Sequence, residues 1–174
     1  MKKVVVIATA SGNGKTTVGR ALAEKLSVPF YELDALHHGP NWVEPTLQDF
    51  RARVEPIVES DAWVIDGAYR GKLGDLVLEG ADTVVWLDLP LRVWLPRLVR
   101  RSARRVIRRE ELWNGNRETL KDVIHPQNSV VLYALGKYRQ QRRTYASELA
   151  RFPLVRLCTQ REVDDFLRSV ERAT

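Results

Sequence analysis

A glycine-rich segment near the N-terminus has the residue types that bind phosphate groups. It reads Gly12-Asn13-Gly14-Lys15-Thr16-Thr17 and fits the end of the G-x-x-x-x-G-K-[ST] pattern, with Thr9 at the first glycine of that pattern. Glycines let backbone N–H groups turn toward phosphate oxygens, Lys15 reaches the β and γ oxygens, and the Thr16 hydroxyl can bind Mg²⁺. We interpret the segment as a triphosphate-binding loop. The alternative is an ordinary glycine-rich turn with an exposed lysine.

Two aspartates have the chemistry that such a loop needs beside it. Asp66 ends a short predicted strand and is followed by Gly67 and, four residues on, by Arg70. A carboxylate there can hold the water ligands of Mg²⁺, and Arg70 can bind an anionic acceptor. Asp34 lies at the end of another predicted strand, where it can orient or deprotonate an acceptor hydroxyl. The alternatives are a surface Asp-Gly turn for Asp66 and a turn cap for Asp34.

The net charge of the chain is concentrated in one segment. Lysines and arginines number 28 against 22 aspartates and glutamates, and the net charge is +6. Residues 97–117 hold eight arginines and two glutamates, so this segment carries the whole excess. It does so with arginine, whose planar fork matches phosphate in two-point contact. The eight are Arg97, Arg100, Arg101, Arg104, Arg105, Arg108, Arg109 and Arg117.

We interpret the arginine segment as a lid. Four of its arginines are spaced so that they share one helical face: Arg97, Arg101, Arg104 and Arg108. Arginines brought over a γ-phosphate stabilise its negative charge, and Asn114-Gly115-Asn116 supplies the flexible end that a closing lid needs. Binding of nucleic acid through its backbone phosphates is the competing interpretation, and a solvated surface is a third.

Alternating strands and helices must position these residues. Apolar, β-branched runs predict strands over 2–9, 29–33, 63–65, 83–87 and 153–158. Apolar stripes predict helices over 16–26, 46–60, 90–111, 118–151 and 161–172. Pro56 is expected to kink the second helix or end it early, and His125-Pro126 to interrupt the fourth. Asp88 is interpreted as the N-cap of the helix that begins at Pro90.

The order of these elements predicts an α/β fold, with a parallel sheet covered by helices on both faces. Ligands of such sheets bind outside the carboxyl ends of the strands, where Thr9, Asp34, Asp66 and Asp88 are expected to lie. The chain has no internal repeat or linker. We therefore predict one domain over residues 1–174, with the lid at about 97–117.

The composition excludes several classes of protein. Cys158 is the only cysteine, so no intramolecular disulfide forms and a reducing cytoplasm is the expected location. No apolar run reaches the ~18 residues that a membrane span needs, and the run over 4–10 is at the lower limit for a signal peptide. His37, His38 and His125 do not predict a metal site, since adjacent side chains such as the first two tend to point apart.

These motifs together resemble the P-loop kinases of the adenylate kinase and shikimate kinase group. Residues 12–17 match the group's G-x-G-K-[ST]-T loop, and residues 66–70 resemble the D-G-F-P-R of adenylate kinases with Ala68 and Tyr69 in place of Phe-Pro. The stretches 32–37 and 40–42 are similar in particular to small adenylate-kinase-related proteins labelled DNA topology modulation proteins. As in that family, residues 84–90 lead into the predicted lid helix.

This resemblance implies a three-layer α/β/α P-loop NTPase fold, with five parallel strands in the order 2-3-1-4-5 and a helical arginine-rich lid. It implies ATP and Mg²⁺ as cofactors. It also implies that Arg97 and Arg101 begin the lid arginines and that Arg143 contacts phosphate. Further residues that it implicates are Thr159 and Arg161 at the adenine and Trp42 among the acceptor residues.

The resulting hypothesis is an ATP-dependent phosphotransferase. ATP binds at the loop of Lys15, Mg²⁺ is held through Thr16 and Asp66, and a nucleotide or small-molecule acceptor lies between Asp34 and Arg70. The alternatives are a nucleic-acid-binding P-loop ATPase that uses the arginine segment, and a nucleotide sensor without turnover. A GTPase is disfavoured because the chain has no N-K-x-D base-reading motif.

Overall fold

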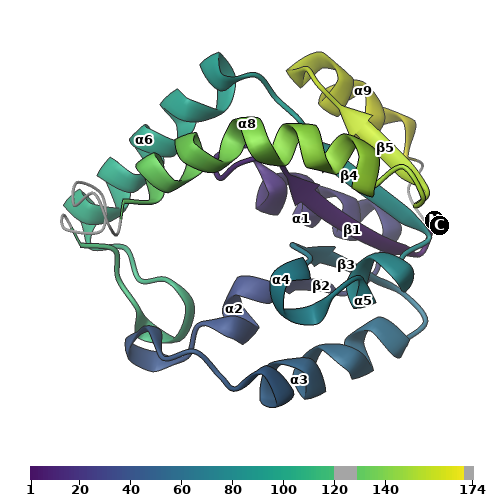
Figure 1. Cartoon of the computed structure of the whole chain (residues 1–174), viewed down its shortest axis with the longest axis horizontal. Helices are drawn as coiled ribbons and strands as arrows, with labels where there is room; N and C mark the ends of the chain where they lie inside the picture. Colours follow the sequence, from purple (N-terminus) through teal and green to yellow (C-terminus); the bar gives the residue numbers. More distant parts are fainter. Residues whose placement is uncertain (120–128, 171–174) are drawn as a thin grey trace.

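Five parallel strands form one sheet at the centre of the molecule (Figure 1). The computed structural model describes residues 1–119 and 129–170. The sheet order is β2-β3-β1-β4-β5, which confirms the order that the resemblance implied. The strands are β1 (Lys3–Ala8), β2 (Phe30–Glu32), β3 (Trp63–Asp66), β4 (Thr83–Leu87) and β5 (Leu154–Leu157).

Helices cover both faces of the sheet, which confirms the three-layer architecture. On one face, Val4 and Val6 of β1 pack with α1 and α9. On the other, Val5 and Ile7 pack with α3, α4 and α5 and with the end of α8. These helices are α1 (Lys15–Leu26), α3 (Leu47–Glu59), α4 (Arg70–Leu73), α5 (Leu76–Glu79), α8 (Val130–Glu148) and α9 (Gln160–Ser169).

Strand β1 shows why the sequence forms a buried parallel sheet. Alternate side chains of a strand point to opposite faces, and here both faces are covered, so an unbroken apolar run is required. Val4, Val5 and Val6 are fully buried. Burial of each such side chain stabilises the fold by about 1.5–3 kcal/mol relative to exposure. The first polar side chain after this run is Thr9, at the carboxyl edge of the sheet.

A third apolar cluster holds the arginine-bearing helix α6 (Leu91–Arg108) beside the loop that follows β1. Trp94 and Leu98 of α6 pack with Ala10 of that loop and Ala134 of α8. Across from α6 and α8 in Figure 1 lies α2 (Leu33–His37), which contacts the short turn η2 (Trp113–Gly115), and η2 in turn contacts η1 (Pro40–Trp42). The site is therefore framed by elements far apart in the sequence.

The structure differs from the sequence prediction in the helices. Pro56 neither ends nor divides α3, which continues to Glu59 because Phe50, Val54 and Val58 bury one continuous stripe. The short helices α2, α4 and α5 were not predicted, since four or five residues are too few to show a periodic pattern. The predicted interruption at His125-Pro126 lies outside the described residues.

Among the residues that the structure describes, no helix combines the length and the apolar character needed to cross a membrane.

Replacement of Phe50 by alanine tests the packing of α3. Phe50 is 1% exposed and its ring contacts those of His37 and Tyr69, so Phe50→Ala is expected to lower the free energy of unfolding by ~3–5 kcal/mol. Urea denaturation measures this change. Leu47→Ala on the same helix is the control, because Leu47 is 56% exposed and its loss should cost less than about 0.5 kcal/mol. Equal effects of the two variants would contradict the proposed core.

Candidate active site

The loop between β1 and α1 has the backbone shape of a phosphate-binding loop. Gly12 and Gly14 have φ angles of 89° and 90°, in the left-handed region that favours glycine. A Cβ on Gly12 would lie 2.7 Å from the carbonyl oxygen of Trp94, so no larger residue fits there. Gly14 is the N-cap of α1, and the loop therefore leads directly to the positive end of a helix dipole.

Asn13 holds this loop in shape. Its side chain is 2% exposed, and its Nδ2 donates to the Ala10 carbonyl at 2.8 Å. Its Oδ1 accepts from the backbone N–H of Leu89 at 3.1 Å. The side chain of Asn13 thereby joins two parts of the loop to the segment that follows β4.

Thr9, at the place of the expected first glycine, anchors the loop to a buried carboxylate. The Thr9 hydroxyl donates to Asp88 Oδ1 at 2.9 Å and accepts from the indole N–H of Trp86 at 3.0 Å. Asp88 Oδ2 accepts from the Nε atoms of Arg142 and Arg156, at 3.1 Å each. The Thr9 hydroxyl therefore helps to hold the start of the loop in place.

The interpretation of Asp88 as a helix cap is wrong. Pro90 is the N-cap of α6, and no side chain caps that end. Asp88 is fully buried and its carboxylate is bound by two arginines from distant elements. A buried charge requires such compensation, and the cations from α8 and β5 supply more of it than a helix N-terminus would.

Lys15, Thr16 and Asp66 form the cluster at the start of α1. The Thr16 hydroxyl donates to Asp66 Oδ2 at 2.6 Å, and Lys15 Nζ lies 3.5 Å from Asp66 Oδ1. Burial raises the pKa of Asp66, an effect that Lys15 and the Thr16 hydrogen bond oppose. A hydroxyl and a carboxylate are hard oxygen donors of the kind that Mg²⁺ prefers, so Thr16 and Asp66 fit a magnesium site.

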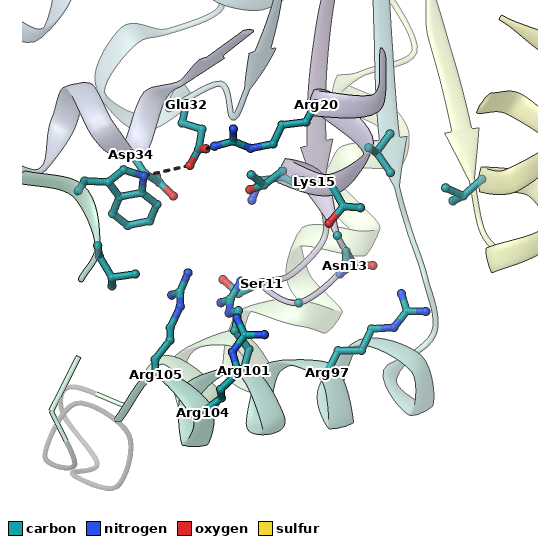
Figure 2. Close-up of a pocket in the computed structure, with 18 of the residues that line it drawn as sticks. Ser11, Asn13, Lys15, Arg20, Glu32, Asp34, Arg97, Arg101, Arg104 and Arg105 are labelled. Atoms are coloured by element: carbon teal, nitrogen blue, oxygen red, sulfur yellow. Dashed lines mark hydrogen bonds and ion pairs between the residues drawn. The ribbon is translucent and has the colours of Figure 1, made fainter. Parts of the chain in front are cut away.

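A cavity of about 900 Å³ extends along the loop, and its walls include Lys15, Thr16 and Thr17. Figure 2 shows Arg97 at one end of this cavity and Asp34 at the other, with Lys15 between them. Arg97 donates to Gln160 at 2.9 Å, and Gln160 also lines the cavity. The cavity thus offers separate ends on the two sides of the phosphate-binding loop.

Four arginines of α6 line the cavity: Arg97, Arg101, Arg104 and Arg105. Arg104 binds Glu110 at 2.9 Å and Arg105 binds Glu118 at 2.6 Å, so both have acidic partners. Arg101 differs, because its buried Nε has no hydrogen-bond partner within residues 1–119 and 129–170. Burial lowers the pKa of Arg101, and neighbouring Arg105 lowers it further. A desolvated guanidinium in this position has the electrostatic character of an anion site.

Asp34 faces the same cavity from the first turn of α2. The hydroxyl of Tyr69 donates to Asp34 Oδ1 at 2.6 Å, and burial and the Asp34 charge together raise the pKa of Tyr69. The tyrosine therefore stays protonated and holds the carboxylate in one orientation. Asp34 Oδ2 has no hydrogen-bond partner in the described part of the chain, so it is available to a ligand.

Arg70 is not among the residues that line the cavity, and its predicted contact with the acceptor stays a prediction. Its Nε lies 2.6 Å from Asp75 Oδ1, and its Nη1 binds Glu148 of α8. Asp75 also binds Arg151. Tyr69 has a left-handed φ of 46°, after which α4 begins, and this turn directs Arg70 toward these acids.

The structure also places four residues implicated by the resemblance outside the cavity walls. Arg143 is exposed on α8, next to the Arg142 that binds Asp88. Thr159 caps α9 by accepting from the Glu162 N–H at 3.1 Å, and Arg161 is exposed beside Asp165 at 3.7 Å. Trp42 is 38% exposed and lies in η1.

Sequence reasoning missed several cavity residues. Glu32 lies two residues before Asp34 at the end of β2, where its Oε2 accepts from the indole of Trp113 at 3.0 Å and its Oε1 binds Arg20. Gln160 lies between the two residues that were implicated at the adenine. The one signal in the sequence that could have found Glu32 and Gln160 is that each lies within two positions of a predicted site residue.

The adjacent histidines behave differently from the expectation that they point apart. Ligand atoms of His37, His38 and Glu44 all lie within 4.8 Å of one another. Lys72 is already placed between two of them, with its Nζ against His37 Nε2 and 2.6 Å from Glu44 Oε2. Burial and the Lys72 charge lower the pKa of His37, so the imidazole accepts from the ammonium group.

Replacement of Thr9 tests the anchor of the loop. Thr9→Val keeps the shape but removes both hydrogen bonds of the buried hydroxyl, which is expected to lower the free energy of unfolding by ~1–3 kcal/mol. Thr9→Ser retains the hydroxyl and is the control. Chemical denaturation of the three proteins measures the difference, and equal stability of the valine and native proteins would exclude the anchor.

Residues 11–40, which contain the loop, match the family model described as shikimate kinase. A shikimate kinase from Ruegeria pomeroyi is 30% identical over 122 residues, which cover 62% of this chain and 63% of the relative. The chain thus spans less than two thirds of the curated relatives that it matches.

Solved structures are similar over nearly the whole chain. Shikimate kinase from Acinetobacter baumannii in complex with shikimate has a TM-score of 0.57 and 20% identity, covering 98% of this chain and 91% of its own. A gluconokinase from Sinorhizobium meliloti has a TM-score of 0.55 and 21% identity, covering 96% and 87%. At these identities the likeness shows the fold alone, and the fold of this chain is that of the P-loop kinases.

Proposed function

We propose that this chain is an ATP-dependent phosphotransferase that moves the γ-phosphate of ATP to the hydroxyl group of a small-molecule acceptor. One observation carries the proposal. Lys15 and Thr16, Asp34, and Arg101, whose Nε has no hydrogen-bond partner within the described residues, line a single cavity, and Asp66 lies beside Lys15 and Thr16. The matches to shikimate kinases support the same reaction class.

Each residue has a separable role in this proposal. Lys15 and the backbone N–H groups of the loop bind the β and γ phosphates, while Arg101 neutralises charge that develops on the transferred group. Thr16 and Asp66 would hold Mg²⁺, which bridges phosphate oxygens and stabilises their charge. The adenosine lies toward the Arg97 and Gln160 end of the cavity, because the Asp34 end is needed for the acceptor.

Asp34 serves as the base for the acceptor. The acceptor oxygen forms a bond to the γ-phosphorus while the bond from that phosphorus to the ADP oxygen breaks, and the hydroxyl proton moves to Asp34. Tyr69 occupies Oδ1, so the proton is taken by Oδ2. The arrangement needs an acceptor with a hydroxyl group and does not define the rest of that molecule. Shikimate, sugars and nucleosides offer such a hydroxyl, and nucleoside monophosphates, whose usual acceptor atom is a phosphate oxygen, are the contrasting class to compare.

The arginine segment favours this function over binding of nucleic acid. Four of its eight arginines line the cavity, and Arg117 lies 3.8 Å from Glu111. Arg100, Arg108 and Arg109 are the exposed remainder that a nucleic acid could contact. If the DNA topology modulation type of function applied, affinity for DNA would fall linearly with salt on a double-logarithmic plot, and replacing these three would reduce the slope.

Lys15→Ala tests nucleotide binding. Loss of a charged donor to the phosphates is expected to weaken Mg·ATP binding roughly 10- to 100-fold, as measured by titration calorimetry. Lys25→Ala at the far end of α1 is the matched control, since Lys25 donates to the Val170 carbonyl away from the cavity. Unchanged ATP binding by the Lys15 variant would rule out the proposed loop function.

Arg101→Ala tests charge neutralisation during transfer. The rate of ATP consumption with the best acceptor of the panel is expected to fall roughly 10³-fold. Arg100→Ala, one residue earlier on the same helix but exposed to solvent, should retain the native rate. The proposal fails in this respect if the two variants lose activity equally.

A further inference from the structure

The loop that follows the arginine helix is bound to the segment that carries Asp34. We call residues 110–118 the lid loop and residues 32–42 the acceptor segment. Trp113 of the lid loop donates to Glu32 Oε2 at 3.0 Å, and Asn114 Nδ2 donates to the carbonyl of Ala35 at 3.1 Å and also to that of His38. These contacts join parts of the chain that are about 80 residues apart.

Asn116 makes the most complete of these contacts. Its Nδ2 donates to the Gly39 carbonyl at 2.8 Å, and its Oδ1 accepts from the backbone N–H of Trp42 at 2.9 Å. The residue is 4% exposed, so both ends of its amide exchange water for a protein partner. A buried amide satisfied at both ends specifies one geometry, because a shift of the loop would leave polar groups unpaired.

The backbone of the lid loop forms a tight turn that suits this docking. Asn114 and Gly115 have left-handed φ angles of 56° and 78°, and the Leu112 N–H donates to the Asn116 carbonyl at 2.7 Å. Asparagine and glycine tolerate this conformation better than other residues. The tight turn places the amides of Asn114 and Asn116 on the side that faces the acceptor segment.

Aromatic rings close the same junction. The ring of His38 stacks on that of Trp113 with centroids 5.9 Å apart, and meets Trp42 edge-on at 5.3 Å. His38 of the acceptor segment therefore lies between a tryptophan of its own segment and one of the lid loop. Trp113 and Leu112 also line the 900 Å³ cavity, so this junction forms part of the wall of the site.

The other side of the lid loop is tied to the arginine helix. Arg105 of α6 binds Glu118 at 2.6 Å with both side chains largely buried, and Arg104 binds Glu110 at 2.9 Å. Glu111 and Arg117 form an antiparallel bridge that closes the loop on itself. The lid loop therefore connects the segment that carries Asp34 to the helix that carries the cavity-lining arginines.

We propose that Asn114 and Asn116 are positioning residues, which hold the α6 arginines over the phosphate-binding loop by clasping the lid loop to the acceptor segment. Because the clasp binds the segment that carries Asp34, it couples the two ends of the site. An acceptor that orders residues 32–42 then increases the affinity for ATP, and ATP increases the affinity for the acceptor by the same factor. The role given to the arginines rests on the proposed function; the clasp itself does not.

Limited proteolysis tests the clasp without any ligand. Trypsin cleaves after arginine, and Arg108, Arg109 and Arg117 flank the clasp. The cleavage rate follows the population of the open form when opening is fast. Asn116→Ala removes two hydrogen bonds, so cleavage at these three sites, read by mass spectrometry, should be roughly tenfold faster. Ile107→Ala is the matched control on α6, because Ile107 is 80% exposed and lies outside the clasp.

Titration with Mg·ATP tests the coupling to the arginines. Asn116→Ala should weaken Mg·ATP binding several-fold, and the additional loss caused by Arg101→Ala should be smaller in that background than in the native one, since the clasp is what positions Arg101. A merely structural role of Asn116 would lower the melting temperature but leave the effect of Arg101→Ala unchanged. If Asn116→Ala does not fold, Asn114→Gly replaces it, because Asn114 is exposed and glycine keeps the left-handed backbone while it removes the two hydrogen bonds to the acceptor segment.

The outcomes separate this proposal from the proposed function. Native cleavage rates in both asparagine variants would overturn the clasp, and faster cleavage with fully additive effects on ATP binding would overturn the coupling. If the native protein does not bind Mg·ATP, the proposed function fails, while the trypsin rates still decide whether the clasp exists. Faster cleavage together with a reduced effect of Arg101→Ala supports both the clasp and its positioning role.

Discussion

Burial of β1 on both of its faces is the constraint on which the site depends. The strand lies between β3 and β4, and the register pairs Val6 with Asp66 and Ala8 with Leu87. Because neighbouring parallel strands end at the same edge, the polar residues that follow them converge there. The loop after β1 thus begins between two carboxylates, Asp66 at the end of β3 and Asp88 just beyond β4.

These two carboxylates occupy equivalent positions but have different environments. Asp88 is enclosed by Thr9, Arg142 and Arg156, and its charge is used to hold the loop against α8 and β5. In the described part of the chain, Asp66 is contacted by Lys15 and Thr16, neither of which fully compensates its charge, and burial raises its pKa. A carboxylate that is incompletely compensated attracts a cation, whereas a fully compensated one does not. The same strand-end position therefore produces an anchor in one case and a candidate metal site in the other.

The arginines of α6 also have two different roles: some bind acids of the fold, and others face the cavity. Arg104 and Arg105 bind acids of the lid loop, while Arg101 remains desolvated and without a partner at its Nε within the described ranges. The excess of +6 therefore does not describe a uniform basic surface. It reflects a helix on which Arg104 and Arg105 hold the lid loop, while Arg97 and Arg101 present guanidinium groups to the cavity.

Local sequence was sufficient for the strands, the phosphate-binding loop and the helical arginine face. β-branched runs, a glycine pattern and a 3.6-residue period are properties of short segments. The elements that they predict are present in the folded structure because the core is built from these elements. The three-layer architecture and its strand order also agreed with the family resemblance. The residues that line the cavity were predicted only in part. Of the predicted residues, Lys15, Asp34, Arg97 and Arg101 line it, and Arg70 does not.

The sheet, the loop and the chemistry available at the strand ends thus follow from local sequence. Tertiary structure decided which partner each charge meets: Arg70 turns to Asp75 and Glu148, Asp88 is bound by arginines more than 50 residues away, and Asn116 docks on Gly39 and Trp42. The physical reason is that a buried charge or amide is satisfied by whatever group lies within about 3 Å after folding. Sequence spacing carries no information about such distances between remote segments.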